Sequence, residues 1–138
     1  MRRWLYDISL KPIFFQMYPE DAHNLSYRLL RLADRVPGCM AILEKLSTYK
    51  SRRLETEVAG ISFSNPLGMA AGFDKTGELY PYLARLGFGH IEVGTITGEE
   101  QPGNPKPRVF RLEKEEALIN RMGFNNPGSE TAYKILSN

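Results

Sequence analysis

Short stretches of this sequence combine small residues with polar side chains that could bind a flat, charged ligand. Ala70, Ala71 and Gly72 are followed by Asp74 and Lys75. Small residues let a ring system lie against the backbone, and a lysine just beyond them can neutralise negative charge that develops on the ring. The same residues would also form an ordinary tight turn between a strand and a helix, with a solvated lysine.

The loop NRMGFNNPG (120–128) is rich in hydrogen-bonding groups. Asn120 both donates and accepts, which suits an imide or a carboxylate, and Gly123 permits close approach of the backbone to a ligand. The alternative is a polar turn that precedes a helix beginning at Ser129. The pair Gly94-Thr95 adds a hydroxyl beside a bare backbone. Together these loops indicate a ligand site more strongly than any one of them does.

A strand, a helix and a second strand would place these loops at one edge of a sheet. The apolar run 65–72 predicts a buried strand, residues 74–87 carry leucines at helical spacing, and residues 88–97 are rich in β-branched side chains. Such a βαβ unit makes the two strands parallel, and ligands bind beyond the carboxyl ends of parallel strands. Hairpins are predicted at 56–63 and 109–119. The predicted fold class is α/β.

The chain before residue 47 has a helical pattern instead. A helix is predicted over residues 19–36, and its apolar stripe consists of Leu25, Leu29, Leu32 and Val36. A second, shorter helix is predicted over 40–46, and the polar, basic stretch 47–55 predicts a linker. The chain therefore divides into a helical segment, 1–46, and an α/β segment, 47–138.

The N-terminal stretch is basic and amphipathic. Its large apolar side chains include Trp4, Leu5, Phe14 and Phe15, and Arg2, Arg3 and Lys11 lie beside them. A segment of this kind can lie in a bilayer interface, with its apolar side down and its cations toward lipid phosphate. Packing of the same surface on the protein's own domain is the alternative.

Composition excludes several classes of protein. A net charge of +2 over 138 residues does not favour nucleic-acid binding, and a single cysteine excludes a disulfide framework. Two histidines far apart in the sequence do not favour a metal site. No apolar stretch approaches the roughly 18 residues of a membrane span. Asp7, Lys11 and Pro12 interrupt the apolar core that a signal peptide would need, so we expect the N-terminus to be retained.

The chemistry-bearing stretches resemble one family. The resemblance is carried by FSNPLGMAAGFDKTGE (63–78), GFGHIEVGTIT (87–97), QPGNPKPRVFRL (101–112) and LINRMGFNNPG (118–128). In this order and spacing they resemble the class 2, quinone-linked dihydroorotate dehydrogenases. PEDAH (19–23) resembles that family's N-terminal extension, which the soluble class 1 enzymes lack. The resemblance implies a (β/α)₈ barrel that holds FMN, preceded by a small helical domain that touches the membrane and admits ubiquinone.

The resemblance also implies roles for individual residues. FMN would contact Ala71, Gly72, Lys75 and Thr95. The dihydroorotate or orotate ring would contact Lys75, Asn120, Arg121, Met122, Gly123 and Phe124. The quinone passage would be lined by His23 and Arg108, although a histidine near a helix start is also a common surface or capping residue.

The implied reaction oxidises dihydroorotate to orotate for pyrimidine biosynthesis. A base removes a proton from C5 while hydride leaves C6, and electrons then pass to a quinone. The family's catalytic serine has no counterpart here, because Ser129 begins a helix in a different motif. A (β/α)₈ barrel takes about 250 residues, so we expect only its first two βα units in this chain.

The resemblance further implies a peripheral protein on the cytoplasmic side of a bacterial cell membrane. Two alternatives stay open at this point. One is another FMN-dependent pyrimidine oxidoreductase that shares the lysine turn, and the other is a non-catalytic membrane-surface fragment.

Overall fold

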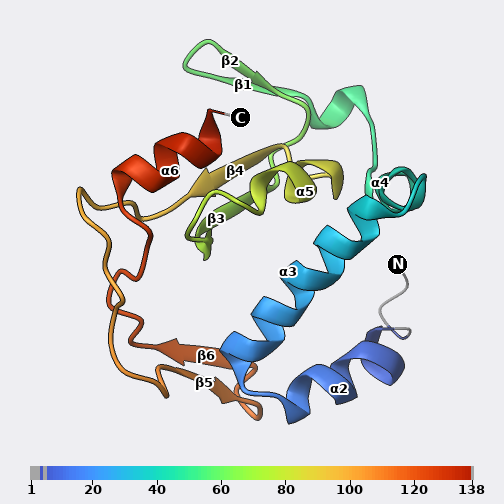
Figure 1. Cartoon of the computed structure of the whole chain (residues 1–138). Helices are drawn as coiled ribbons and strands as arrows, with labels where there is room; N and C mark the ends of the chain where they lie inside the picture. The colour runs from blue at the N-terminus through green and yellow to red at the C-terminus, as the bar shows by residue number, and fades with distance from the viewer. Residues whose placement is uncertain (1–3, 5, 138) are drawn as a thin grey trace.

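The computed structural model describes residue 4 and residues 6–137. Helices make up the N-terminal part, and three two-stranded sheets with two further α-helices make up the rest of the described chain (Figure 1). The architecture is therefore α/β, as predicted. Arg2, Arg3 and Leu5, which belong to the predicted amphipathic start, lie outside the described residues.

The helical segment contains a π-helix and three α-helices: η1 (Tyr6–Leu10), α2 (Lys11–Gln16), α3 (Pro19–Arg35) and α4 (Cys39–Ser47). Proline in the first turn suits the start of α3, because the first N–H groups of a helix have no partner inside it. Gly38, in the left-handed region at φ 80°, separates α3 from α4. Both predicted helices are thus confirmed. The predicted linker 47–55 contains a short 3₁₀ turn, η2 (Arg52–Leu54).

The strands form the predicted pairs. The elements are β1 (Thr56–Val58), β2 (Ile61–Phe63), β3 (Gly68–Asp74), β4 (His90–Val93), β5 (Val109–Leu112) and β6 (Ala117–Asn120). The first and last pairs are antiparallel hairpins. Strands β3 and β4 are parallel, with a register shift between Met69 and Asp74. The last helix, α6 (Ser129–Leu136), begins where it was predicted.

The predicted helix over 74–87 is much shorter in the structure. Helix α5 spans Tyr80–Arg85, and β3 continues to Asp74 instead of ending at residue 72. The cause is the carboxylate of Asp74, which accepts hydrogen bonds from the backbone N–H groups of Gly77, Leu79 and Tyr80 at 2.8–2.9 Å. These bonds hold residues 75–79 as a loop, because the N–H groups are already paired.

The prediction that 65–72 forms a buried strand is wrong for this chain. Residues 70–73 are exposed, and within the described residues β3 pairs only with β4. Much of the stripe of α3 is exposed as well: Leu29, Leu32 and Val36 are 48–57% exposed, and Leu25 is partly buried. A small core forms where α4 contacts α5: Met40 of α4, Leu83 of α5 and Leu79, which precedes α5, are at most 5% exposed.

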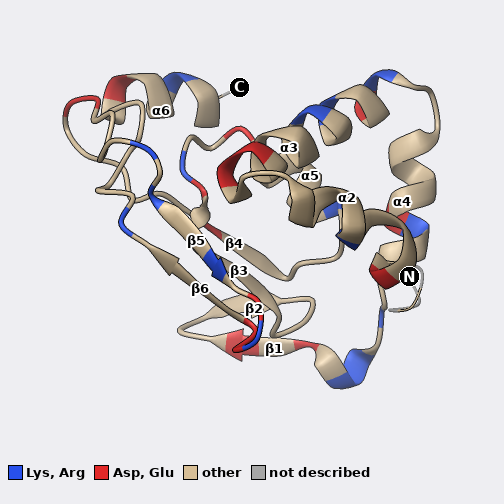
Figure 2. Ribbon diagram, turned by 90° about the horizontal axis from the view of Figure 1, so that it is seen from below, with Lys and Arg blue, Asp and Glu red and all other residues tan. Residues whose placement is uncertain are grey.

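The helical segment contacts the α/β segment at both ends of α3. The start of α3 contacts β5, and α4, after its end, contacts α5 (Figure 1). Acidic residues mark the start of α3, and basic residues lie along β5 (Figure 2). The two segments that are separate in the sequence are therefore held together by oppositely charged elements.

Candidate functional site

A cavity of about 930 Å³ lies between the helical segment and the strands. Its walls come from α2 and α3, from the loop after β3, and from the β5–β6 hairpin. The predicted site residues that line it are Gly72, Lys75, Asn120, Met122 and His23. The predicted site residues outside its described lining are Ala71, Thr95, Arg108, Arg121, Gly123 and Phe124. The cavity thus unites residues from three distant parts of the sequence.

The end of β3 offers open space beside a fixed backbone. Gly72 has φ 95°, and a Cβ there would meet nothing within 4 Å. Its N–H donates to the carbonyl of Gly94 at 2.7 Å, and the N–H of Gly94 donates to the carbonyl of Asp74 at 2.9 Å. Ala71, which precedes Gly72, and Thr95, which follows Gly94, are both exposed. A flat ring could approach this backbone without meeting a side chain.

Lys75 is the first residue after β3 and is half-buried in the cavity wall. Burial lowers the pKa of its ammonium group; the charge of Arg108 lowers that pKa further, and the charge of Glu20 raises it. Asp74, only 1% exposed, fixes the loop that begins at Lys75. The lysine is therefore a cation on a well-ordered turn, close enough to the cavity to act on a ligand.

The loop after β6 presents different residues to the cavity and to the strands behind it. Asn120 and Met122 line the cavity. The side chain of Arg121 points elsewhere, since it donates to the carbonyl of Pro107 at 3.0 Å. Phe124 is 64% exposed at φ 55°. Asn120 and Met122 thus present an amide and a thioether to the cavity, whereas the side chain of Arg121 binds the neighbouring loop.

Next to this loop, one buried polar atom has no partner. Asn125 lines the cavity, and its Oδ1 is the buried side-chain acceptor that lacks a hydrogen bond among the described residues. Asn126 differs, because its Oδ1 accepts from the N–H groups of Thr97 and Gly128 at 3.1 and 3.0 Å. An unpaired buried acceptor is costly unless a ligand or water supplies a donor.

His23 faces the cavity from α3. Its ring packs edge-on against Phe73, with ring centroids 4.8 Å apart. Burial lowers the pKa of the imidazole, and the nearby carboxylates of Asp74 and Glu20 oppose that effect. His23 therefore lies on the face of α3 that contacts the end of β3 and lines the cavity, not on the outer surface.

The described residues contain neither a candidate metal site nor a candidate membrane-spanning helix. No cluster of His, Cys, Asp and Glu among them is arranged to hold a metal ion. None of the described helices has both the length and the apolar character that crossing a membrane requires.

Comparison with known proteins decides the family. The family model described as "Dihydroorotate dehydrogenase" matches residues 53–138. The chain belongs to the dihydroorotate dehydrogenase family. Relatives named "Dihydroorotate dehydrogenase (quinone)" extend the match into the helical segment. The relative from Christiangramia forsetii is 47% identical over 135 residues, which is 97% of this chain and 40% of that protein. The relative from Streptomyces coelicolor is 49% identical over 125 residues, 91% of this chain and 34% of that protein.

Solved structures agree. The crystal structure of DHODH from Eimeria tenella in complex with ferulenol has a TM-score of 0.64 and 38% identity, covering 85% of this chain and 29% of that one. The ligand-free DHODH of the same organism has the same TM-score and identity. The chain thus spans only 29% of that structure and 34–40% of the two curated relatives above.

Sequence reasoning did not assign Arg111 or Asn125 to the site, and both line the cavity. Arg111 lines it, and its guanidinium donates to the carbonyls of Met17 and Phe14 at 2.6 and 3.1 Å. Arg108 was the arginine predicted for this wall. Alternation along β5 was the available signal, because Val109 and Arg111 share one face of a strand. For Asn125, the second missed residue, no signal separates it from Asn126 in the sequence.

Proposed function

We propose that this chain is the N-terminal part of a quinone-linked dihydroorotate dehydrogenase that oxidises dihydroorotate to orotate with FMN in pyrimidine biosynthesis. The observation that carries the proposal is the cavity, where Lys75 from the end of β3 meets Asn120, Met122 and Asn125 beside a helical segment. The names of the relatives support the quinone as electron acceptor. They favour this function over another FMN-dependent pyrimidine oxidoreductase and over a non-catalytic fragment.

The proposed architecture is the start of a (β/α)₈ barrel, 47–138, behind a helical domain, 1–46. The parallel pair β3–β4 with α5 between its strands supports a barrel beginning, since a barrel repeats this unit. Exposed apolar residues such as Leu67 (63%) and Phe73 (40%) fit a sheet that continues into further strands. The similarity of the E. tenella structures supports the same view.

The residues at the end of β3 fit FMN. We assign Ala71, Gly72, Lys75 and Thr95 to its binding, because the backbone at Gly72 is open and Lys75 supplies a cation at the cavity wall. FMN, when bound, supplies the acceptor for the hydride that leaves the substrate. Lys75 would stabilise the negative charge that this transfer creates, and Asp74 would hold the lysine turn in place.

The loop after β6 would bind the pyrimidine. We assign this role to Lys75 and to the loop residues Asn120, Arg121, Met122, Gly123 and Phe124. The unpaired Oδ1 of Asn125 supports the assignment, because dihydroorotate and orotate carry ring N–H donors that could pair with it. We assign no catalytic base to this chain, since Ser129 opens α6 and its hydroxyl donates to the carbonyl of Gly98.

The helical side of the cavity would admit the quinone. We keep His23 and Arg108 as proposed residues of the passage and add Arg111, which lines the cavity. Exposed apolar residues of the helical segment, including Trp4, Ile8 and Ile13, support a peripheral contact with the cell membrane from its cytoplasmic side. Such a surface would let a lipid-soluble quinone enter without leaving the bilayer.

The proposal is tested in a full-length enzyme, made by joining residues 1–138 to the C-terminal part of the C. forsetii relative; we call it the completed enzyme. We expect it to retain FMN, to bleach with dihydroorotate in the absence of oxygen, and to turn over with a quinone. Reduction by fumarate or a nicotinamide with none by a quinone would favour a different pyrimidine oxidoreductase. Lipid binding without retention of FMN would favour the non-catalytic alternative.

A further inference from the structure

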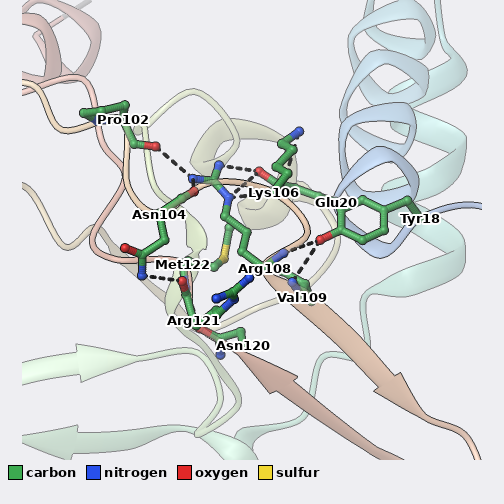
Figure 3. A network of polar contacts seen from close by, with 10 residues as sticks. All are labelled: Tyr18, Glu20, Pro102, Asn104, Lys106, Arg108, Val109, Asn120, Arg121 and Met122. Carbon is green, nitrogen blue, oxygen red and sulfur yellow. Dashed lines mark hydrogen bonds and ion pairs between the residues drawn. The ribbon is translucent and has the colours of Figure 1, made fainter.

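Arg108 is a buried cation that connects the helical segment to the strands. Its residue is 7% exposed, and its side chain forks between two sets of partners (Figure 3). One set is the carboxylate of Glu20 in the first turn of α3, which accepts from Nε at 3.1 and 3.2 Å and from Nη2 at 2.5 Å. The Glu20 side chain is itself only 11% exposed. A charge pair this buried requires good geometry to be tolerated.

The other set of partners belongs to the loop before β5. Nη1 of Arg108 donates to the carbonyls of Pro102 and Asn104 at 2.8 and 3.0 Å. Nearby, the hydroxyl of Tyr18 accepts from the backbone N–H groups of Arg108 and Val109 at 2.5 and 3.0 Å. The start of α3 therefore holds both the side chain and the backbone of this loop.

This loop in turn holds the loop after β6. The backbone N–H of Asn104 donates to the carbonyl of Met122 at 2.9 Å, and its side-chain amide donates to the carbonyl of Arg121 at 2.7 Å. The N–H of Arg121 donates to the carbonyl of Arg108 at 2.9 Å. The fit is close, since a Cβ on Gly103 would stand 2.3 Å from the carbonyl oxygen of Met122.

We propose that Glu20 is a positioning residue for the pyrimidine loop 120–124 and acts on it through Arg108 and Asn104. The inference rests on the proposed function, which assigns the pyrimidine to that loop. It adds that the helical segment serves the dihydroorotate half-reaction as well as the quinone. Glu20 lines the helical side of the cavity, whereas the loop that it positions lies on the strand side.

The test compares two neighbouring acidic residues in the completed enzyme. Glu20→Gln removes the buried charge but keeps the shape, and Asp21→Asn makes the same change on an exposed residue of the same helical turn. The dissociation constant of orotate is measured from the flavin spectrum, the KM of dihydroorotate and of the quinone from turnover, and FMN content from absorbance. We expect Glu20→Gln to raise the orotate and dihydroorotate constants roughly tenfold or more. Its FMN content should equal that of Asp21→Asn.

A second variant tests the route. Asn104→Ala should give the same defect, and the double variant with Glu20→Gln should be no worse than the more affected single variant, because both changes interrupt one connection. Fully additive effects would overturn the route. A Glu20→Gln defect confined to the quinone KM, or a uniform loss of FMN with unchanged orotate affinity, would overturn the positioning role.

Hydrogen exchange separates this inference from the function on which it rests. Peptides covering 120–124 should exchange faster in Glu20→Gln than in Asp21→Asn, whatever ligand the loop binds. Faster exchange in an enzyme that does not oxidise dihydroorotate would refute the proposed function but support the connection from Glu20 to the loop 120–124. Normal dihydroorotate oxidation with unchanged exchange and orotate affinity would refute the connection alone. If Glu20→Gln does not fold, Asn104→Ala and its exchange pattern decide the same question.

Discussion

The back and the front of the loop after β6 differ in how completely their polar groups are paired. At the back, the carbonyls of Arg121 and Met122 accept hydrogen bonds from Asn104, and the N–H of Arg121 binds the carbonyl of Arg108. At the front, Asn120 and Asn125 face the cavity, and Oδ1 of Asn125 is unpaired within the described chain. The difference indicates a backbone fixed by the protein and side chains kept for a ligand.

The lysine turn after β3 repeats this division. Behind it, the buried carboxylate of Asp74 binds the backbone N–H groups of residues 77, 79 and 80. In front, Lys75 lines the cavity and burial lowers its pKa. In both places hydrogen bonds behind the loop fix its backbone, so that a neighbouring side chain can meet the ligand in a set position, which is what preorganised binding requires.

Among the changes that test this division, truncation of the helical segment should have the largest effect on activity. A helical segment that served only the quinone could be removed without loss of flavin reduction by dihydroorotate. Removing residues 1–46 also removes Tyr18 and Glu20, which hold Arg108 and the loop behind the proposed pyrimidine site. We therefore expect this truncation of the completed enzyme to abolish quinone turnover and also to slow flavin reduction at least tenfold.

A shorter truncation is its control. Removing residues 1–16 takes away η1 and α2 but keeps Tyr18 and Glu20, so long-chain quinone turnover should fall while flavin reduction stays near that of the complete chain. Stopped-flow absorbance measures the reduction, and steady-state assays measure the quinone. Equal loss of both half-reactions in the shorter truncation would contradict the division of roles.

Replacing Lys75 should have the next largest effect, and it removes the front of the lysine turn without touching its back. Lys75→Ala should slow flavin reduction by dihydroorotate on the order of a hundredfold, because one preorganised charge at the reacting group is lost. FMN content should change far less. Lys114→Ala, an exposed lysine in the β5–β6 turn, is the matched control. Unchanged single-turnover reduction in Lys75→Ala would remove Lys75 from the site.

The sequence predicted the elements that depend on local pattern and missed those that depend on distant partners. The βαβ unit, both hairpins and the helix from Ser129 follow from periodicity and turn residues. The length of α5 could not be predicted, because Asp74 competes for the N–H groups that would have extended it. The bond between Arg108 and Glu20 joins positions 88 residues apart, so nothing in the local sequence indicates that Glu20 holds the side chain of Arg108.

Replacing each of two adjacent asparagines should separate ligand binding at the front of the loop from stability at its back, with smaller changes than those expected for Lys75→Ala. Asn125→Ala removes the unpaired acceptor in the cavity, so the dissociation constant of orotate should rise about tenfold while stability stays the same. Asn126→Ala removes an amide paired with Thr97 and Gly128, so its melting temperature should fall. Titration of the flavin spectrum and thermal unfolding measure the two effects. Loss of stability in Asn125→Ala with unchanged orotate affinity would contradict the comparison.

The last prediction concerns the stability of the fold at low pH. The hydrogen bond between Glu20 and Arg108 holds the pKa of Glu20 below its ordinary value of 4.5, although burial opposes the shift. Because the carboxylate binds a proton less readily in the folded state than in the unfolded state, its contribution to stability is complete above pH 4.5. That contribution is lost as the pH falls through the folded-state pKa. The glutamine in Glu20→Gln does not titrate, so it gives the reference.

We therefore expect the melting temperature of the completed enzyme to exceed that of Glu20→Gln by a constant amount near neutral pH. Losing one partner of a buried pair costs about 3–5 kcal/mol when the other charge stays unpaired, and less here because glutamine still accepts one hydrogen bond. Below pH 4.5 the difference should shrink, since protonated Glu20 then resembles glutamine. Thermal unfolding of both proteins, followed by fluorescence across this range, measures it. A difference that stays constant or grows on acidification would show that Glu20 does not hold Arg108 as a carboxylate, and that the back of the loop is fixed by backbone contacts alone.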